Sequence, residues 1–103
     1  MAAPMRMRAL QTSGVTEVKI LMKHDMETGL RKDDAGKLVP AHFIQTVSVM
    51  HQDKEVLAAQ FGPSIAKDPF LAFKFKGGVK GEKVIVTWHD NLGEQRTDEA
   101  LIV

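Results

Sequence analysis

In its first third the chain reads Val18-Lys19-Ile20-Leu21-Met22-Lys23-His24, a segment whose apolar and polar side chains follow a period of two. In an extended strand Val18, Ile20, Met22 and His24 share one face, and Lys19 and Lys23 share the other. This pattern predicts a β-strand with one face in a core and one face in water.

The same period returns in most of the remaining chain. Glycine- and proline-containing turns separate the segments, and no segment of helical period competes with them. Regular short strands with turn signals between them favour a β-sandwich. The expected strands are Phe43–His51, Glu55–Phe61, Phe70–Lys76, Glu82–His89 and a last edge strand within Gln95–Val103. We therefore predict an all-β, immunoglobulin-like (fibronectin III-like) antiparallel sandwich of about seven strands.

The interval between the strand at Val18–His24 and the strand at Phe43–His51 predicts a short hairpin. Gly29–Lys32 and Lys37–Val39 form its sides, and Asp33-Asp34-Ala35-Gly36 closes it. Aspartate opening a turn and glycine accepting a positive φ at its end are the favoured residue types.

The length of 103 residues is enough for one hydrophobic core. We expect a flexible lead-in over residues 1–14 and a single sandwich domain over residues 15–103. The apolar runs are too short to cross a bilayer, and the first residues contain no apolar stretch of the kind found in secretory signal peptides.

The chain has 14 Lys and Arg, 13 Asp and Glu and no cysteine. With opposite charges interspersed, nothing predicts a field that attracts nucleic acid or an anionic membrane. Without cysteine there is no disulfide, no thiolate metal site and no thiol nucleophile.

The sequence also contains no constellation that indicates catalysis. The serines lack the setting of a nucleophile, and the paired carboxylates lie in turns or at strand edges. His42 and His89 fall on predicted solvent faces, whereas His24 and His51 end strands on the core side. A binding module is therefore favoured over an enzyme. The alternative is a small periplasmic copper- or zinc-binding sandwich that uses His24, Met22, Met26 and a further histidine.

Four motifs in a fixed order resemble the SoxZ family, the Z subunits of SoxYZ sulfur carriers in bacterial thiosulfate oxidation. The resemblance extends from about residue 16 to the end of the chain. Where the family pattern usually has proline, this chain has Asp25, which makes the turn less rigid. The motifs are His24–Asp33, Pro40–Ile44, Phe61–Phe70 and Val86–Gly93.

The resemblance implies a non-catalytic subunit, without a cofactor, that pairs with a SoxY-like protein and helps dock it to other Sox enzymes. SoxY carries the single cysteine on which sulfur intermediates travel. The family also implies a periplasmic location, reached by export together with the partner. The free strand edge at Gln95–Val103 leaves homodimers open when SoxY is absent. The residues expected at the partner interface are His24, Met26, Arg31, Phe43, Trp88, Asp90 and Asn91.

Overall fold

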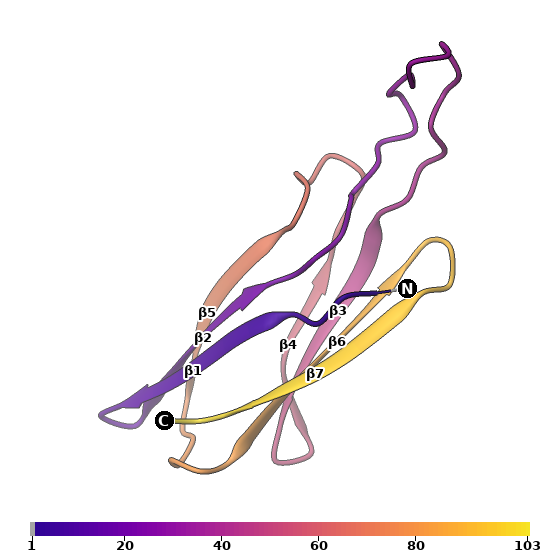
Figure 1. Ribbon diagram of the computed structural model, residues 1–103. Helices are drawn as coiled ribbons and strands as arrows, with labels where there is room; N and C mark the ends of the chain where they lie inside the picture. The colour runs from indigo at the N-terminus through magenta and orange to yellow at the C-terminus, as the bar shows by residue number, and fades with distance from the viewer. Residues whose placement is uncertain (1) are drawn as a thin grey trace.

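The computed structural model describes residues 2–103 and shows two antiparallel sheets packed face to face (Figure 1). Three strands form one sheet in the order β1-β2-β5, and four form the other in the order β4-β3-β6-β7. The strands are β1 (Arg6–Thr12), β2 (Val15–Leu21), β3 (Ile44–His51), β4 (Lys54–Gln60), β5 (Phe70–Lys76), β6 (Lys83–Asp90) and β7 (Gln95–Leu101). The predicted all-β sandwich is confirmed.

The inward positions of the strands build one core around Trp88. Val18 and Ile20 of β2 face Val47 and Val49 of β3, and all four are buried. Their alternation with exposed neighbours is the period of two that predicts these strands from the sequence. The described residues include no helix, so none is long and apolar enough to span a membrane.

The expected flexible lead-in is wrong for residues 6–12, which form β1, while residue 1 lies outside the described residues. β1 pairs along its whole length with β2, and Ala9 is buried. The end of the chain also contacts β1: Val103 N–H donates to Ala9 O, and Gln11 N–H donates to Val103 O, both at 2.9 Å. β1 therefore begins the domain, and residues 102–103 are not a free edge.

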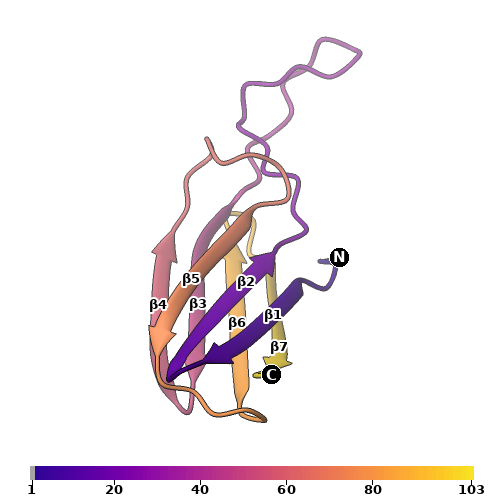
Figure 2. The ribbon, with the colours of Figure 1, turned by 90° about the vertical axis from the view of Figure 1, so that its left-hand side faces the viewer.

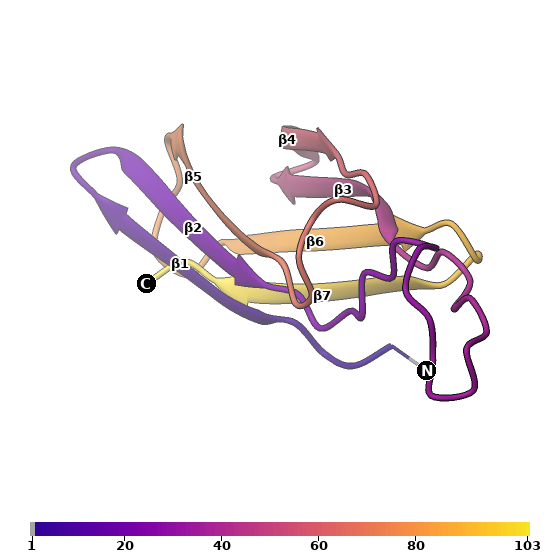
Figure 3. The ribbon, with the colours of Figure 1, turned by 90° about the horizontal axis from the view of Figure 1, so that it is seen from above.

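The two long sides of the sandwich differ. On one side the end of the chain beyond β7 joins β1 through a parallel bridge between Ala9 and Ile102. On the other side β4 and β5 do not pair with each other (Figure 3). Leu57, Phe73 and Phe75 on these two strands are only half-buried. The sandwich is thus closed by hydrogen bonds on one side alone.

A hairpin of residues 27–42, which we call the arm, projects beyond one end of the sandwich (Figure 1). Isolated bridges join Glu27 to His42 and Lys32 to Leu38, and the predicted turn at Asp33–Gly36 is present. The sides of the arm are not regular strands. The principal extents of the molecule are 53 × 20 × 20 Å and its radius of gyration is 15.4 Å. A compact domain of this length has a radius of gyration of about 13 Å, so the arm makes the molecule elongated.

Candidate functional site

The arm joins the sandwich at a polar cluster centred on the buried carboxylate of Asp90, the last residue of β6. Asp90 Oδ2 lies 3.0 Å from His24 Nε2 and 2.7 Å from His42 Nε2. Its Oδ1 accepts hydrogen bonds from the backbone N–H groups of Leu92 and Glu94. One carboxylate therefore ties the segment that leads into the arm, at His24, and the last residue of the arm, His42, to the β6–β7 turn.

The hydrogen bonds fix the proton positions on His24. The Met26 N–H donates to His24 Nδ1 at 3.0 Å, so the neutral ring carries its proton on Nε2 and donates it to Asp90. Met26 has a φ of 51°, an uncommon value for a residue with a side chain. The backbone turn that makes this contact is thus held in a strained conformation by its surroundings.

Opposing effects set the pKa of Asp90. Burial of the carboxyl group raises the pKa, whereas hydrogen bonds from His24, His42 and the two backbone amides lower it, and the net pKa is below the ordinary value of 3.8. Asp90 is consequently ionised at neutral pH and stays the acceptor of the cluster.

Asn91 holds the second side of the arm where it enters β3. Its Oδ1 accepts from Phe43 N–H at 2.8 Å, and its Nδ2 donates to Ala41 O at 2.8 Å. Met26 contributes from the first side, since its Sδ accepts from the Ile44 N–H. Residues 90 and 91 therefore fix the path of the backbone on both sides of the arm.

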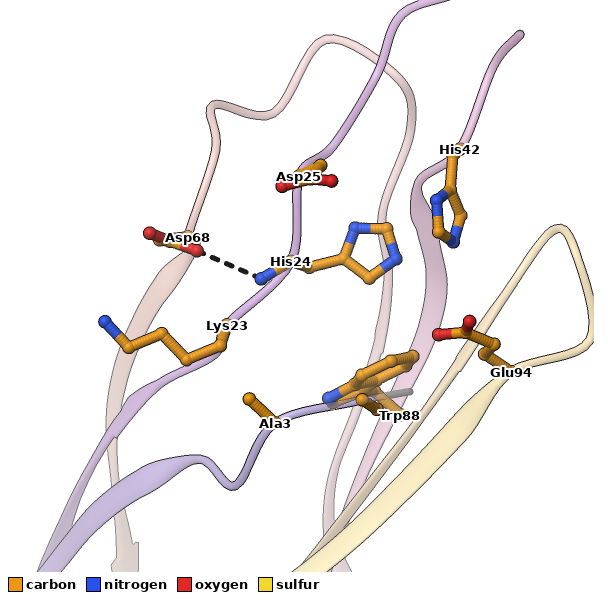
Figure 4. Close-up of a pocket in the computed structure, with 9 residues that line it drawn as sticks. Ala3, Lys23, His24, Asp25, His42, Asp68, Trp88 and Glu94 are labelled. Carbon is orange, nitrogen blue, oxygen red and sulfur yellow. Dashed lines mark hydrogen bonds between the residues drawn. The ribbon is translucent and has the colours of Figure 1, made fainter.

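A pocket of about 300 Å³ opens beside this cluster (Figure 4). The rings of His24 and His42 lie edge to face with centroids 4.5 Å apart, and Trp88 packs edge-on below His24. No described residue accepts a hydrogen bond from the buried Trp88 Nε1. The lining residues are Ala2, Ala3, Lys23, His24, Asp25, His42, Asp68, Trp88 and Glu94.

Six of the seven residues expected at the partner interface gather at the base of the arm. His24, Met26, Trp88 and Asp90 are buried, and Phe43 and Asn91 are half-buried. Arg31 lies in the arm itself and pairs with Glu27, with 2.6 Å between Arg31 Nη2 and Glu27 Oε2. The interface role of the set stays a prediction, and the buried members are placed to shape the arm.

The position expected for His42 is wrong, because its ring turns from solvent to Asp90 and its side chain is only 25% exposed. His42 lies within residues 22–43, which are not part of a regular strand. The alternation of a strand therefore does not determine where the His42 side chain points. His89 is exposed as expected. The contact joins residues 48 positions apart, and no spacing in the sequence signals it.

The structure places the residues of the metal-binding alternative differently from what a site built on Met22 and Met26 requires. Met22 is fully buried in the core, and Met26 Sδ already accepts a hydrogen bond. The group whose ligand atoms all lie within 4.8 Å of one another is instead His24, His42 and Asp90. A metal ion there would displace both Nε2 protons, and neutral His24 would then need its other proton on Nδ1, where it opposes the Met26 N–H. The observed hydrogen bonds therefore favour a hydrogen-bonded network of these three side chains over a metal site.

Fold and site together define a class: a fibronectin III-like sandwich protein whose polar cluster anchors a projecting hairpin. The family model described as sulphur oxidation protein SoxZ matches residues 5–101. The chain belongs to the SoxZ family and is a component of sulfur oxidation. None of the curated protein sequences compared with the chain matches it significantly.

Solved structures extend the likeness of the fold. Two superoxide reductase (neelaredoxin) variants from Archaeoglobus fulgidus, both in the reduced form, are 20% identical to this chain. The first has a TM-score of 0.63 and covers 97% of this chain and 89% of its own. The second has a TM-score of 0.59, with 95% and 84% covered. At this identity the likeness concerns the fold alone.

Proposed function

We propose that this chain is the non-catalytic subunit of a SoxYZ-type sulfur carrier and that its arm contacts the SoxY-like partner. The observation that carries the proposal is the arm with its exposed leucines. Leu30 is 82% exposed and Leu38 is 59% exposed, on a hairpin that projects from the sandwich. Apolar side chains on a projecting segment are a feature of protein interaction sites.

The base of the arm supports the same function. Because Asp90 and Asn91 fix the backbone on both sides, part of the ordering that binding requires has already taken place before the partner arrives. The pocket of about 300 Å³ beside the base adds a concave surface next to the arm, which suits a partner segment.

The composition fits a carrier in which a second chain supplies the thiol. With no cysteine in its sequence, this chain has no thiol on which a sulfur intermediate could be carried. A thiol on a second subunit then has no competitor within the pair for thiol exchange. We further propose that the pair works in the periplasm and that this chain is exported together with SoxY.

Binding to the SoxY-like chain of the same organism tests the proposal. The variant Leu30→Ser/Leu38→Ser removes two exposed apolar side chains from the arm. Its control, Val79→Ser/Leu101→Ser, replaces two apolar side chains that are 64% and 55% exposed. They belong to the β5–β6 connection and to the last residue of β7, which lie at the end of the sandwich away from the arm (Figure 1). Titration calorimetry measures the dissociation constant for wild type and both variants.

We expect the arm variant to bind about 30- to 100-fold more weakly, which corresponds to about 2–3 kcal/mol, because each leucine loses buried apolar area at the interface. The control should stay within about 3-fold of wild type, since ordinary surface substitutions change free energies by about 0.5 kcal/mol. Equal binding by the arm variant would remove the arm from the interface. No binding of the wild type at about 10 μM SoxY, the range of ordinary specific complexes, would exclude the pairing itself.

A further inference from the structure

The outer face of the three-stranded sheet carries charges that the near-neutral composition conceals. Strand alternation points five cationic side chains and one carboxylate to the same side, which faces the viewer in Figure 2. The cations are Arg6 and Arg8 of β1, Lys19 of β2, and Lys74 and Lys76 of β5; the carboxylate is Glu17 of β2. We call this surface the basic face. Opposite charges that are interspersed along the sequence are therefore separated on this face.

The charges on the basic face are only partly neutralised, because Glu17, which lies opposite Lys74 on β5, is its one carboxylate against five cations. Lys19 Nζ lies 4.0 Å from Glu17, and within the described part of the chain no ion pair involves Arg6, Arg8, Lys74 or Lys76. Arg8 and Lys19 are direct cross-strand partners, an arrangement of like charges that destabilises a sheet. Cations at the edge strands deter aggregation, but Lys19 lies on the central strand, where that reason does not apply.

A shallow apolar hollow of about 250 Å³ lies at one end of the basic face. Leu21 and Phe70, which are cross-strand partners, form its apolar floor, and Phe70 is 63% exposed. Arg6, Arg8 and Lys19 surround it. An apolar centre with a charged rim is the anatomy of a protein interface.

We propose that the basic face docks an acidic protein surface that places an apolar side chain in this hollow. Three strands of seven residues offer roughly 350 Å², well below the roughly 800 Å² that each partner contributes to a stable complex. Charge complementarity on so small a face serves fast, salt-sensitive encounters more than permanent assembly. The occupant is therefore a visiting protein, and the arm is left for the permanent partner.

This inference rests on the proposed function in one respect: the visitors are the enzymes that act on the SoxY-bound sulfur. The test uses the heterodimer of this chain with SoxY and the purified Sox enzymes of the same organism, with binding rates measured at about 50 mM and 300 mM NaCl, on either side of physiological screening. The variant is Arg8→Glu/Lys76→Glu. The control, Lys54→Glu/Lys80→Glu, makes the same charge change at exposed positions off the basic face.

We expect at least one enzyme to bind wild type about 10-fold more weakly at the higher salt, and the basic-face variant to lose at least about 10-fold at the lower salt, mainly through a slower association rate. The control should stay within about 3-fold, and both variants should pair normally with SoxY. Thermal unfolding of both variants confirms that each folds.

Two results overturn the inference while leaving the proposed function intact. One is unchanged enzyme binding by the basic-face variant. The other is binding of wild type, but not of the variant, to vesicles of phosphatidylcholine and phosphatidylglycerol in place of any enzyme. Loss of SoxY pairing by the basic-face variant would assign the face to the permanent contact and also overturn it. If wild type fails to pair with SoxY, the proposed function is wrong. Binding of the enzymes to the free chain is then measured instead. The absence of a complex that depends on salt and on Arg8 would overturn the inference separately.

Discussion

In the sandwich, strands pair with their neighbours over most of their length and bury one face in a shared core. In the arm, two isolated bridges and one turn hold residues 27–42, and Leu30 and Leu38 remain exposed. The sandwich thus spreads its stability over many equivalent contacts. The arm takes its position from a few polar contacts at its base.

This difference indicates what each region is for. A region with its own core can serve as a scaffold without help from another molecule. A region that exposes apolar side chains on a preorganised backbone gains its remaining contacts from a partner. The following substitutions separate the two regions, from the largest expected effect to the smallest.

Asp90→Ala attacks the base of the arm most directly. It leaves His24 and two backbone N–H groups without their acceptor, so we expect the free energy of unfolding to fall by about 3 kcal/mol. Urea denaturation measures this value. Asp98→Ala is the matched change in the sandwich, where Asp98 accepts from Met5 N–H and Arg96, and there we expect about 1 kcal/mol.

Limited proteolysis shows where the loss falls. Cleavage within residues 27–42 should accelerate in Asp90→Ala more than global stability explains, whereas Asp98→Ala should show no such excess. An equal loss for the two variants without faster cleavage of the arm would contradict the special role of Asp90.

The pH dependence of the free energy of unfolding tests the same carboxylate in the wild-type chain. The pKa of Asp90 is lower in the folded chain than its ordinary value of 3.8, so its ionised form stabilises the fold above that pH. As pH falls from about 5 through the folded-state pKa, this contribution is lost. Asp90→Asn should therefore have a flatter decline of stability with falling pH than wild type. Parallel curves over this range would contradict the assignment.

The smallest effect is expected at the β3–β4 turn in the sandwich. Gln52 and Asp53 have φ values of 51° and 60°, the left-handed conformations of a two-residue hairpin turn in which glycine is favoured. Asp53→Gly should raise the free energy of unfolding by about 0.5–1 kcal/mol, because glycine adopts positive φ without strain. Thermal melting provides the measurement, and arm proteolysis should stay unchanged. A lower melting temperature would show that Asp53 contributes more than its backbone conformation costs.

Much of the fold could be predicted from the sequence because the strands of the sandwich bury one face. Val84, Val86 and Trp88 of β6 are buried as their alternation indicates. β1 was missed because its residues depart from a clear alternation: the buried Ala9 is small, the apolar Leu10 points outward and the polar Gln11 points inward. Its second pairing, with the end of the chain, is between residues far apart in the sequence.

The candidate site was less predictable for a related reason. The turn at Asp33–Gly36 depends on local chemistry, and it was correctly predicted. The meeting of His24, His42 and Asp90 depends on where three separate segments end, and local pattern carries no information about that. The basic face was missed because positive and negative residues are balanced along the sequence. When side chains alternate between the two faces of the sheet, most of the positive ones come to lie on the same face.

The bridge between Ala9 and Ile102 has a consequence for how the molecule assembles. It connects Ala9 of β1 to Ile102, which follows β7, so a growing polypeptide cannot complete this side until residue 102 has left the ribosome. Until then one edge of β1 has unpaired backbone groups that a foreign strand could join. Contacts of such long sequence separation also slow folding. The side that is closed in the finished sandwich is thus still open during synthesis.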